Sequence, residues 1–216
     1  MVFESPYPLS VPNIDYLTYL FTSTVFKPND KVWIEATTPS NYITQSRALE
    51  LTQRIGAGLQ SLGINRPRSV TDERHIVLLC SENQVMTSVT MFGIINAGGV
   101  VCTCPPQASS LEIARQIGSC RPKVVICSPG ILKTALEGVK GSVLKDLPVA
   151  VMDSADGKQE VRLLDGTSLV SERKLDLEKI TDSDTLSKRV CFLGYSSGTT
   201  GVPKGTTISG PCGRRI

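Results

Sequence analysis

The residues of this chain with the most chemical potential gather in one short segment, residues 195–205. Glycines at three positions let the backbone adopt positive φ and turn its N–H groups toward anionic oxygens. Hydroxyl side chains fill four further positions, and Lys204 supplies a positive charge. The glycines are Gly198, Gly201 and Gly205, and the hydroxyl residues are Ser196, Ser197, Thr199 and Thr200. This combination predicts a loop that binds a polyphosphate.

The loop differs from the Walker A motif, in which a lysine directly follows a glycine and precedes serine or threonine. Here Pro203 precedes Lys204 and Gly205 follows it. Residues 206–209 predict a strand rather than a helix, so we expect the loop to join two strands. The alternative is a flexible Ser/Gly turn without a ligand. The lysine and the run of hydroxyls directly after an apolar strand disfavour that alternative.

The elements that must position the loop alternate between strand and helix. Short apolar runs separated by helical patterns predict a parallel sheet that is covered on both faces, an α/β fold. The expected strands span residues 75–80, 100–104, 123–127, 148–152 and 190–195, and the expected helices span 84–96, 109–118 and 131–139. Residues 154–189 are polar and weakly periodic, and they predict a loop-rich connection.

The first 65 residues predict a separate group of elements. Apolar residues recur at helical spacing over residues 14–21. The pattern also predicts a short strand over residues 31–35 and a long amphipathic helix over residues 44–62. One face of this long helix carries Leu51, Ile55, Leu59 and Leu62. Its Gly56-x-Gly58 lacks the third glycine and the preceding strand of a dinucleotide-binding motif, so we expect these glycines to serve close helix packing.

Composition excludes several classes of protein. The chain has 216 residues, of which 40% are hydrophobic and 20% charged, as in ordinary globular proteins. The net charge of +3 comes from scattered lysines and arginines, so no nucleic-acid interface is expected. No apolar stretch is long enough to span a membrane. No signal peptide is visible, and a cytoplasmic location is expected.

The cysteines predict packing rather than a disulfide scaffold. There are seven of them, an odd number, and no C-x-x-C pair occurs. Most lie in apolar runs, where a free cysteine acts as a small hydrophobic residue in a reducing compartment. Cys102 and Cys104 share one face of a strand, so a metal or redox pair there is the alternative.

Residues 195–205 match, position for position, the signature of the adenylate-forming (AMP-binding) superfamily of acyl-CoA synthetases, peptide-synthetase adenylation domains and luciferases. The Ser-Ser-Gly-Thr-Thr-Gly form most resembles 4-coumarate–CoA ligases and fungal acyl-CoA ligases. Upstream features agree over residues 5–209: Ser5-Pro-Tyr-Pro8, the helix that ends before Gly63, and residues 93–99 leading to Cys104-Pro-Pro106.

The resemblance implies a fold and a reaction. The fold would be part of the large N-terminal domain of such an enzyme. The enzyme would join a small carboxylic acid to AMP, using ATP and Mg²⁺, and then transfer the acyl group to coenzyme A. The implied ATP-binding residues are Ser196, Ser197, Gly198, Thr199, Thr200 and Lys204.

The resemblance also implies that much of the enzyme lies outside this chain. Its relatives are more than twice as long, and residues 210–216 diverge from them. We therefore expect residues 1–209 to be a partial AMP-binding domain that is inactive alone. Residues 75–209 would be a nearly complete sheet, and residues 1–65 would be elements of a sheet that is otherwise missing.

Several expectations follow from this incompleteness. The apolar face of the helix over 44–62 would lack cover and promote self-association. No catalytic residue or metal ligand is expected, and His75 is expected to be structural. A peroxisomal address would lie beyond this chain. Two other functions stay open: a non-catalytic module that binds ATP or a partner, and an adenylation domain that serves a carrier protein.

Overall fold

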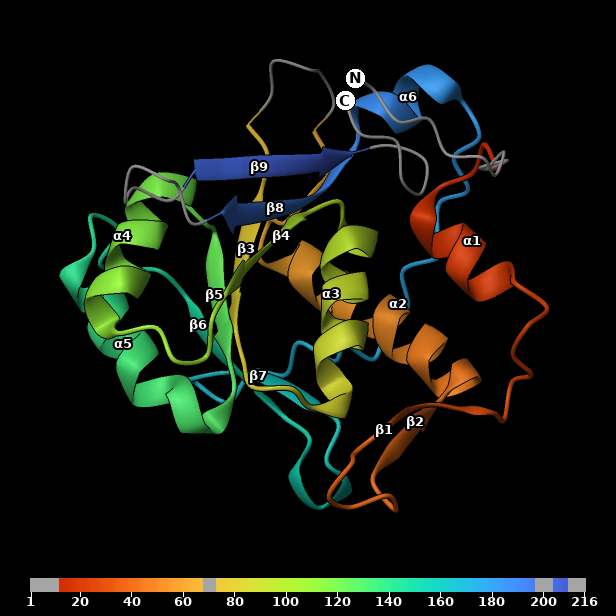
Figure 1. The fold of residues 1–216 in the computed structure, drawn as a ribbon, viewed down its shortest axis with the longest axis horizontal. Helices are drawn as coiled ribbons and strands as arrows, with labels where there is room; N and C mark the ends of the chain where they lie inside the picture. Colours follow the sequence, from red (N-terminus) through yellow and green to blue (C-terminus); the bar gives the residue numbers. More distant parts are fainter. Residues whose placement is uncertain (1–11, 68–72, 197–203, 210–216) are drawn as a thin grey trace, which may run out of the picture.

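The computed structural model describes residues 12–67, 73–196 and 204–209. Within them, seven strands form a mostly parallel sheet with the order β7-β6-β5-β3-β4-β8-β9 (Figure 1). Only the edge strands β7 and β9 run antiparallel to their neighbours. The strands are β3 (Ile76–Cys80), β4 (Val100–Cys104), β5 (Val124–Cys127), β6 (Val149–Asp153), β7 (Glu160–Leu163), β8 (Val190–Ser196) and β9 (Lys204–Ser209). The predicted α/β architecture is confirmed.

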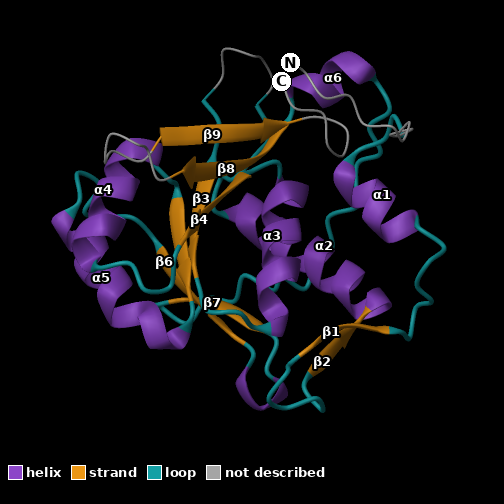
Figure 2. Ribbon diagram, viewed as in Figure 1, coloured by secondary structure: helices purple, strands orange, loops and turns teal. Residues whose placement is uncertain are grey.

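Helices cover both faces of this sheet (Figure 2). One face packs against α1 (Tyr16–Thr22), α2 (Gln45–Ser61) and α3 (Val85–Ala97), and the other against α4 (Ser110–Cys120) and α5 (Leu132–Gly141). The helices predicted before residue 140 are each found within a few residues of their expected bounds. None of the helices in the described ranges has the length and apolar character needed to cross a membrane.

Three of these helices begin at side chains that cap them, and in α1 the carboxylate of Asp15 accepts from the backbone N–H of Thr18. The Thr44 hydroxyl accepts a hydrogen bond from the backbone N–H of Arg47, at the start of α2. Ser109 and Glu112 form a reciprocal capping box at the start of α4, in which each side chain accepts from the other residue's backbone N–H. Such caps satisfy backbone donors that have no partner within the helix.

Glycines allow α2 and α3 to cross closely. A Cβ atom added to Gly93 would lie 2.5 Å from Cγ2 of Ile55, and one added to Gly56 would lie 2.9 Å from Nδ2 of Asn96. Gly58 faces the backbone carbonyl of Leu169, 2.1 Å from the position that its own Cβ would take. The prediction that Gly56 and Gly58 serve close packing is confirmed.

The expectation that the apolar face of α2 lacks cover is wrong. Leu51, Ile55 and Leu59 are each 0% exposed, and Leu62 is half-buried. The cover comes from α3, which is buried around most of its circumference because it lies between the sheet and α2. Helix α2 therefore belongs to the same core as the parallel strands.

The connection over residues 154–189 holds more structure than its sequence predicts. It contains β7, which pairs antiparallel with β6, and the short helix α6 (Ser183–Lys188). Leu169 and Ile180 from this connection are buried, and Leu169 lies in the core beside α2 and α3. Farther from the sheet, β1 (Lys31–Ile34) and β2 (Tyr42–Thr44) form a separate antiparallel pair.

The substitution Gly93→Ala tests the close crossing of α2 and α3. The added methyl group would overlap Ile55, and overpacking of this kind lowers the free energy of unfolding by about 1–3 kcal/mol. Gly118→Ala in α4 is the matched control, since its Cβ would meet only Cγ2 of Val143 at 3.9 Å. That control should be neutral or stabilising by up to about 1 kcal/mol. Urea unfolding measures both values, and equal values would contradict the packing argument.

Candidate functional site

The predicted phosphate loop lies between the antiparallel strands β8 and β9. The register pairs Tyr195 with Gly205 and Ser196 with Lys204, so the last described residues on either side of the loop are neighbours. The prediction that two strands flank the loop is confirmed. The other four predicted ATP-binding residues lie outside the described part of the chain: Ser197, Gly198, Thr199 and Thr200. The role of all six in binding ATP stays a prediction.

The sheet places this hairpin at the edge where its parallel strands end. Strand β8 runs parallel to β4, with Phe192 opposite Val101 and Leu193 opposite Cys102. The carboxyl end of β8 therefore lies at the same edge of the sheet as the carboxyl ends of β3, β4 and β5. Parallel α/β folds bind their ligands at this edge.

Tyr195 connects the end of β8 to helix α4. Its hydroxyl donates a hydrogen bond to Oγ of Ser119, at a distance of 2.9 Å. Burial raises the pKa of the Tyr195 hydroxyl, although the hydrogen bond to Ser119 acts to lower it. These residues are 76 positions apart, and sequence analysis did not pair them.

A polar cleft of about 660 Å³ opens beside the carboxyl ends of β3, β5 and β6. Its other wall is the turn between β1 and β2. The acidic side chains in its lining are Glu35, Glu82, Asp153 and Asp156. Sequence analysis missed this cleft, although serine and glutamate directly after a buried strand, as at Ser81-Glu82, were a usable signal.

The acidic groups of this cleft are held by neighbours within the protein. Oε2 of Glu82 accepts a hydrogen bond from Ser128 at 2.7 Å. Asp153 accepts from the backbone N–H of Ala155 at 2.9 Å and from Nζ of Lys158 at 3.1 Å. Burial acts to raise the pKa of Asp153, but these two donors outweigh it and the pKa is lowered. A cleft lined by carboxylates repels polyphosphate, which favours the hairpin as the phosphate site.

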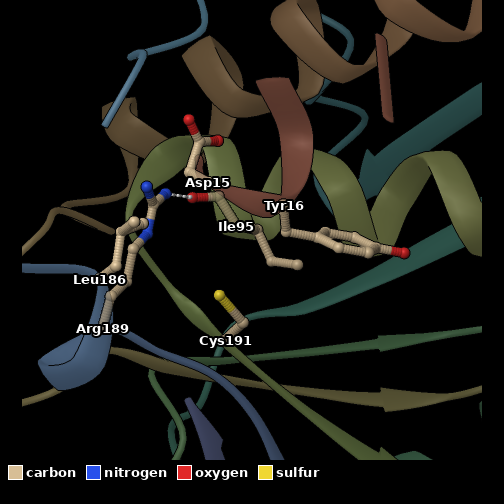
Figure 3. Close-up of a pocket in the computed structure, with 6 residues that line it drawn as sticks. All are labelled: Asp15, Tyr16, Ile95, Leu186, Arg189 and Cys191. Carbon is tan, nitrogen blue, oxygen red and sulfur yellow. Dashed lines mark hydrogen bonds between the residues drawn. The ribbon is translucent and has the colours of Figure 1, made fainter. Parts of the chain in front are cut away.

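A smaller pocket lies at the opposite end of β8, lined by six residues (Figure 3): Asp15, Tyr16, Ile95, Leu186, Arg189 and Cys191. Arg189 donates to the backbone carbonyl of Ile95 at 3.1 Å and so caps the end of α3. Asp15 accepts from the backbone N–H groups of Thr18 and Ile180, each at 3.0 Å. These contacts tie the start of α1 to Ile180 and the end of α3 to Arg189, directly before β8, so we assign the pocket a structural role.

Arg66 lies near this pocket and forms an ion pair with Glu178. Burial, and secondly repulsion from Arg189, lower the pKa of Arg66 to about 10. The guanidinium therefore still carries its charge at neutral pH.

The histidine and the cysteines have structural surroundings. Nδ1 of His75 accepts a hydrogen bond from the backbone N–H of Asn65 at 2.9 Å. The six cysteines in the described ranges are free, and five of them are buried on the α4/α5 side of the sheet: Cys80, Cys102, Cys104, Cys120 and Cys127. Their packing role is confirmed. Among the described residues, no three His, Cys, Asp or Glu side chains are grouped so that they could hold a metal ion.

Known proteins resemble this chain along nearly its whole length. A putative acyl-coenzyme A synthetase of Emericella nidulans is 31% identical over an alignment of 215 positions, which covers 95% of this chain and 37% of that protein. The phenylacetyl-CoA ligase epaB of Aspergillus niger is 24% identical over 206 residues, 94% of this chain and 37% of that protein. The chain thus spans little more than a third of the length of these relatives.

Solved structures have the same fold. An anthranilate CoA ligase in complex with anthranoyl-AMP superimposes with a TM-score of 0.68 at 19% identity, over 92% of this chain and 34% of that one. A luciferase of Phrixothrix hirtus gives a TM-score of 0.68 at 22% identity, over 89% of this chain and 34% of its own. The family model described as AMP-binding enzyme matches residues 21–210. With most of its length matched, the chain belongs to the family of AMP-binding enzymes.

Proposed function

We propose that this chain supplies the phosphate-binding part of an ATP-dependent acyl- or aryl-CoA ligase. The observation that carries the proposal is the β8–β9 hairpin, which pairs Ser196 with Lys204 at the carboxyl edge of a parallel sheet. A loop rich in glycine and hydroxyl residues at that place suits a polyphosphate. The names of the relatives, an acyl-coenzyme A synthetase and a phenylacetyl-CoA ligase, support the same reaction class.

The proposed reaction has two steps. A carboxylate oxygen of the substrate attacks the α-phosphorus of ATP, which gives an acyl-adenylate and releases pyrophosphate. The thiol of coenzyme A then loses its proton and attacks the acyl carbon, so that a thioester forms and AMP leaves. In the first step the loop would hold the β- and γ-phosphates, stabilising charge as pyrophosphate departs. Lys204 would act as a point charge on these oxygens.

The other components of the reaction are assigned only by class. Mg²⁺ would arrive bound to ATP, and we assign it no ligand among the described residues. We propose that residues 1–209 are part of a larger AMP-binding domain. The separate β1–β2 pair supports a further sheet to which residues 1–65 contribute, while residues 75–209 form the sheet of the phosphate loop. We also propose the cytosol as the compartment, because the described cysteines are free thiols.

The purified 216-residue chain should show no adenylation activity. Over the described residues, only the phosphate end of a nucleotide has an assigned site, and catalysis also requires the carboxylate to be held in line with the α-phosphorus. Carboxylate-dependent exchange of pyrophosphate into ATP measures the first step. Exchange above that of the Lys204→Ala variant would show that the chain is a complete catalyst.

Nucleotide affinity should be confined to the phosphates, so ATP and inorganic triphosphate should compete on similar terms. Lys204→Ala should weaken triphosphate binding about ten- to a hundredfold, since a hydrogen bond to a charged group contributes about 1.5–3 kcal/mol. Lys140→Ala is the matched control, because this exposed lysine ends α5 at the opposite edge of the sheet. Equilibrium dialysis measures these affinities. A strong preference for ATP over GTP would contradict the proposal.

We further propose that the chain self-associates through exposed apolar side chains between residues 19 and 42. Five of the ten large exposed hydrophobic residues in the described ranges lie there: Tyr19, Val25, Phe26, Ile34 and Tyr42. Exposed apolar side chains drive association where they gather on a surface.

The double substitution Val25→Asp and Ile34→Thr should therefore shift the chain toward monomer in light scattering. Leu164→Thr, which alters a residue of similar exposure (55%) in another region, should leave the distribution unchanged. If the double variant associates as the original chain does, the patch is not responsible.

A further inference from the structure

The tip of the β8–β9 hairpin has little support from the rest of the sheet. Strand β8 pairs with β4 only at Phe192 and Leu193, so the three residues of β8 that follow are paired with β9 alone. A ribbon of two strands has marginal stability in water. The phosphate loop needs some other contact if its two ends are to keep a fixed position.

Tyr195 makes such a contact through its hydroxyl group. The hydrogen bond of 2.9 Å to Ser119 joins the last turn of α4 to the residue directly before Ser196. Among the side chains that the structure describes, no other hydrogen bond or ion pair links the hairpin beyond Leu193 to a different element. Figure 1 shows the carboxyl end of β8 beside α4.

Helix α4 is a firm base for this contact. Its start is fixed by the Ser109–Glu112 capping box, and Ile113 and Ile117 are both 0% exposed in the core. Gln116 also donates to the backbone carbonyl of Thr103 in β4, at 2.9 Å. These contacts hold Ser119 in position relative to the sheet without help from Tyr195.

The ring of Tyr195 lies beside the other strand of the hairpin. A Cβ atom on Gly205 would lie 3.6 Å from Cε1 and 3.7 Å from Cζ of Tyr195, so the ring lies over this glycine. Gly205 is the cross-strand partner of Tyr195 and directly follows Lys204. The side chain of Tyr195 thus lies beside the opposite strand of the hairpin and is hydrogen-bonded to helix α4.

We propose that Tyr195 and Ser119 are positioning residues for the phosphate loop: their hydrogen bond fixes the closing pair Ser196–Lys204 against α4. The proposal rests on the proposed function, in which this loop holds the phosphates of ATP. A preorganised loop binds its ligand more tightly, because less conformational entropy is lost on binding.

The test uses four variants of the 216-residue chain. Tyr195→Phe keeps the ring and removes the hydroxyl group that donates. Ser119→Ala removes the acceptor, and the double variant combines both changes. Ser119→Thr keeps a hydroxyl group at the acceptor position. Tyr19→Phe is the control, since Tyr19 is an exposed tyrosine in α1. Triphosphate affinity, backbone amide exchange at Ser196 and Lys204, and the midpoint of urea unfolding are measured for each.

Each single loss should weaken triphosphate binding about two- to tenfold, the range expected for one hydrogen bond. Amide exchange at Ser196 and Lys204 should accelerate in both single variants, while the urea midpoint of unfolding stays unchanged. The double variant should be no weaker than either single variant, because both remove the same bond. Ser119→Thr and Tyr19→Phe should match the original chain.

The two proposals can fail separately. If the original chain binds triphosphate no better than Lys204→Ala, the proposed function fails, and the exchange rates still decide whether the bond positions the hairpin. If Tyr195→Phe and Ser119→Ala exchange at Ser196 and Lys204 as the original chain does, the positioning role is overturned. Additive losses in the double variant would overturn it as well, because the two hydroxyls would then act independently.

Discussion

The contact between α2 and α3 is the constraint on which the rest of the structure depends. Helix α3 packs one side on the parallel strands and the other on α2, and ten of its thirteen residues are buried. Such a helix must be apolar on nearly all sides and must have a small residue where its neighbour crosses. Gly93 fills that place opposite Ile55. The crossing makes one core from the N-terminal elements and the sheet, and this core supports the strands that carry the site.

The charges along the carboxyl edge of the sheet divide the site into two parts. Near β5 and β6 the edge is acidic, with Glu82 and Asp153 held by donors of the protein. Near β8 and β9 lie the paired residues Ser196 and Lys204, which flank the proposed phosphate loop. In the proposed function, an anionic ligand would be repelled from the acidic part of this edge and attracted to the part near Lys204.

Most of the sheet could be predicted because its strands are buried on both faces and α2, α4 and α5 are amphipathic. The exceptions have physical reasons. Strand β7 escaped prediction because it is a half-exposed edge strand with a charged residue at every second position, Glu160 and Arg162. The cover of α2 could not be predicted, because periodicity shows that a helix has an apolar face but does not show which element covers it. The loop was evident from its composition, whereas the bond between Ser119 and Tyr195 joins residues 76 positions apart and depends on how α4 and the hairpin pack together.

The reactivity of the buried thiols near the carboxyl edge of the sheet reports on unfolding. Cys104, Cys80 and Cys127 are register partners on adjacent strands β4, β3 and β5. All are at most 4% exposed, and burial raises the pKa of Cys127 to about 12. Since the thiolate is the form that reacts with alkylating reagents, burial shields all three thiols while the fold is closed, and the raised pKa protects Cys127 a second time. Their alkylation rate therefore follows the opening of the central strands, so the stability of this sheet can be followed by mass spectrometry without introducing any label site.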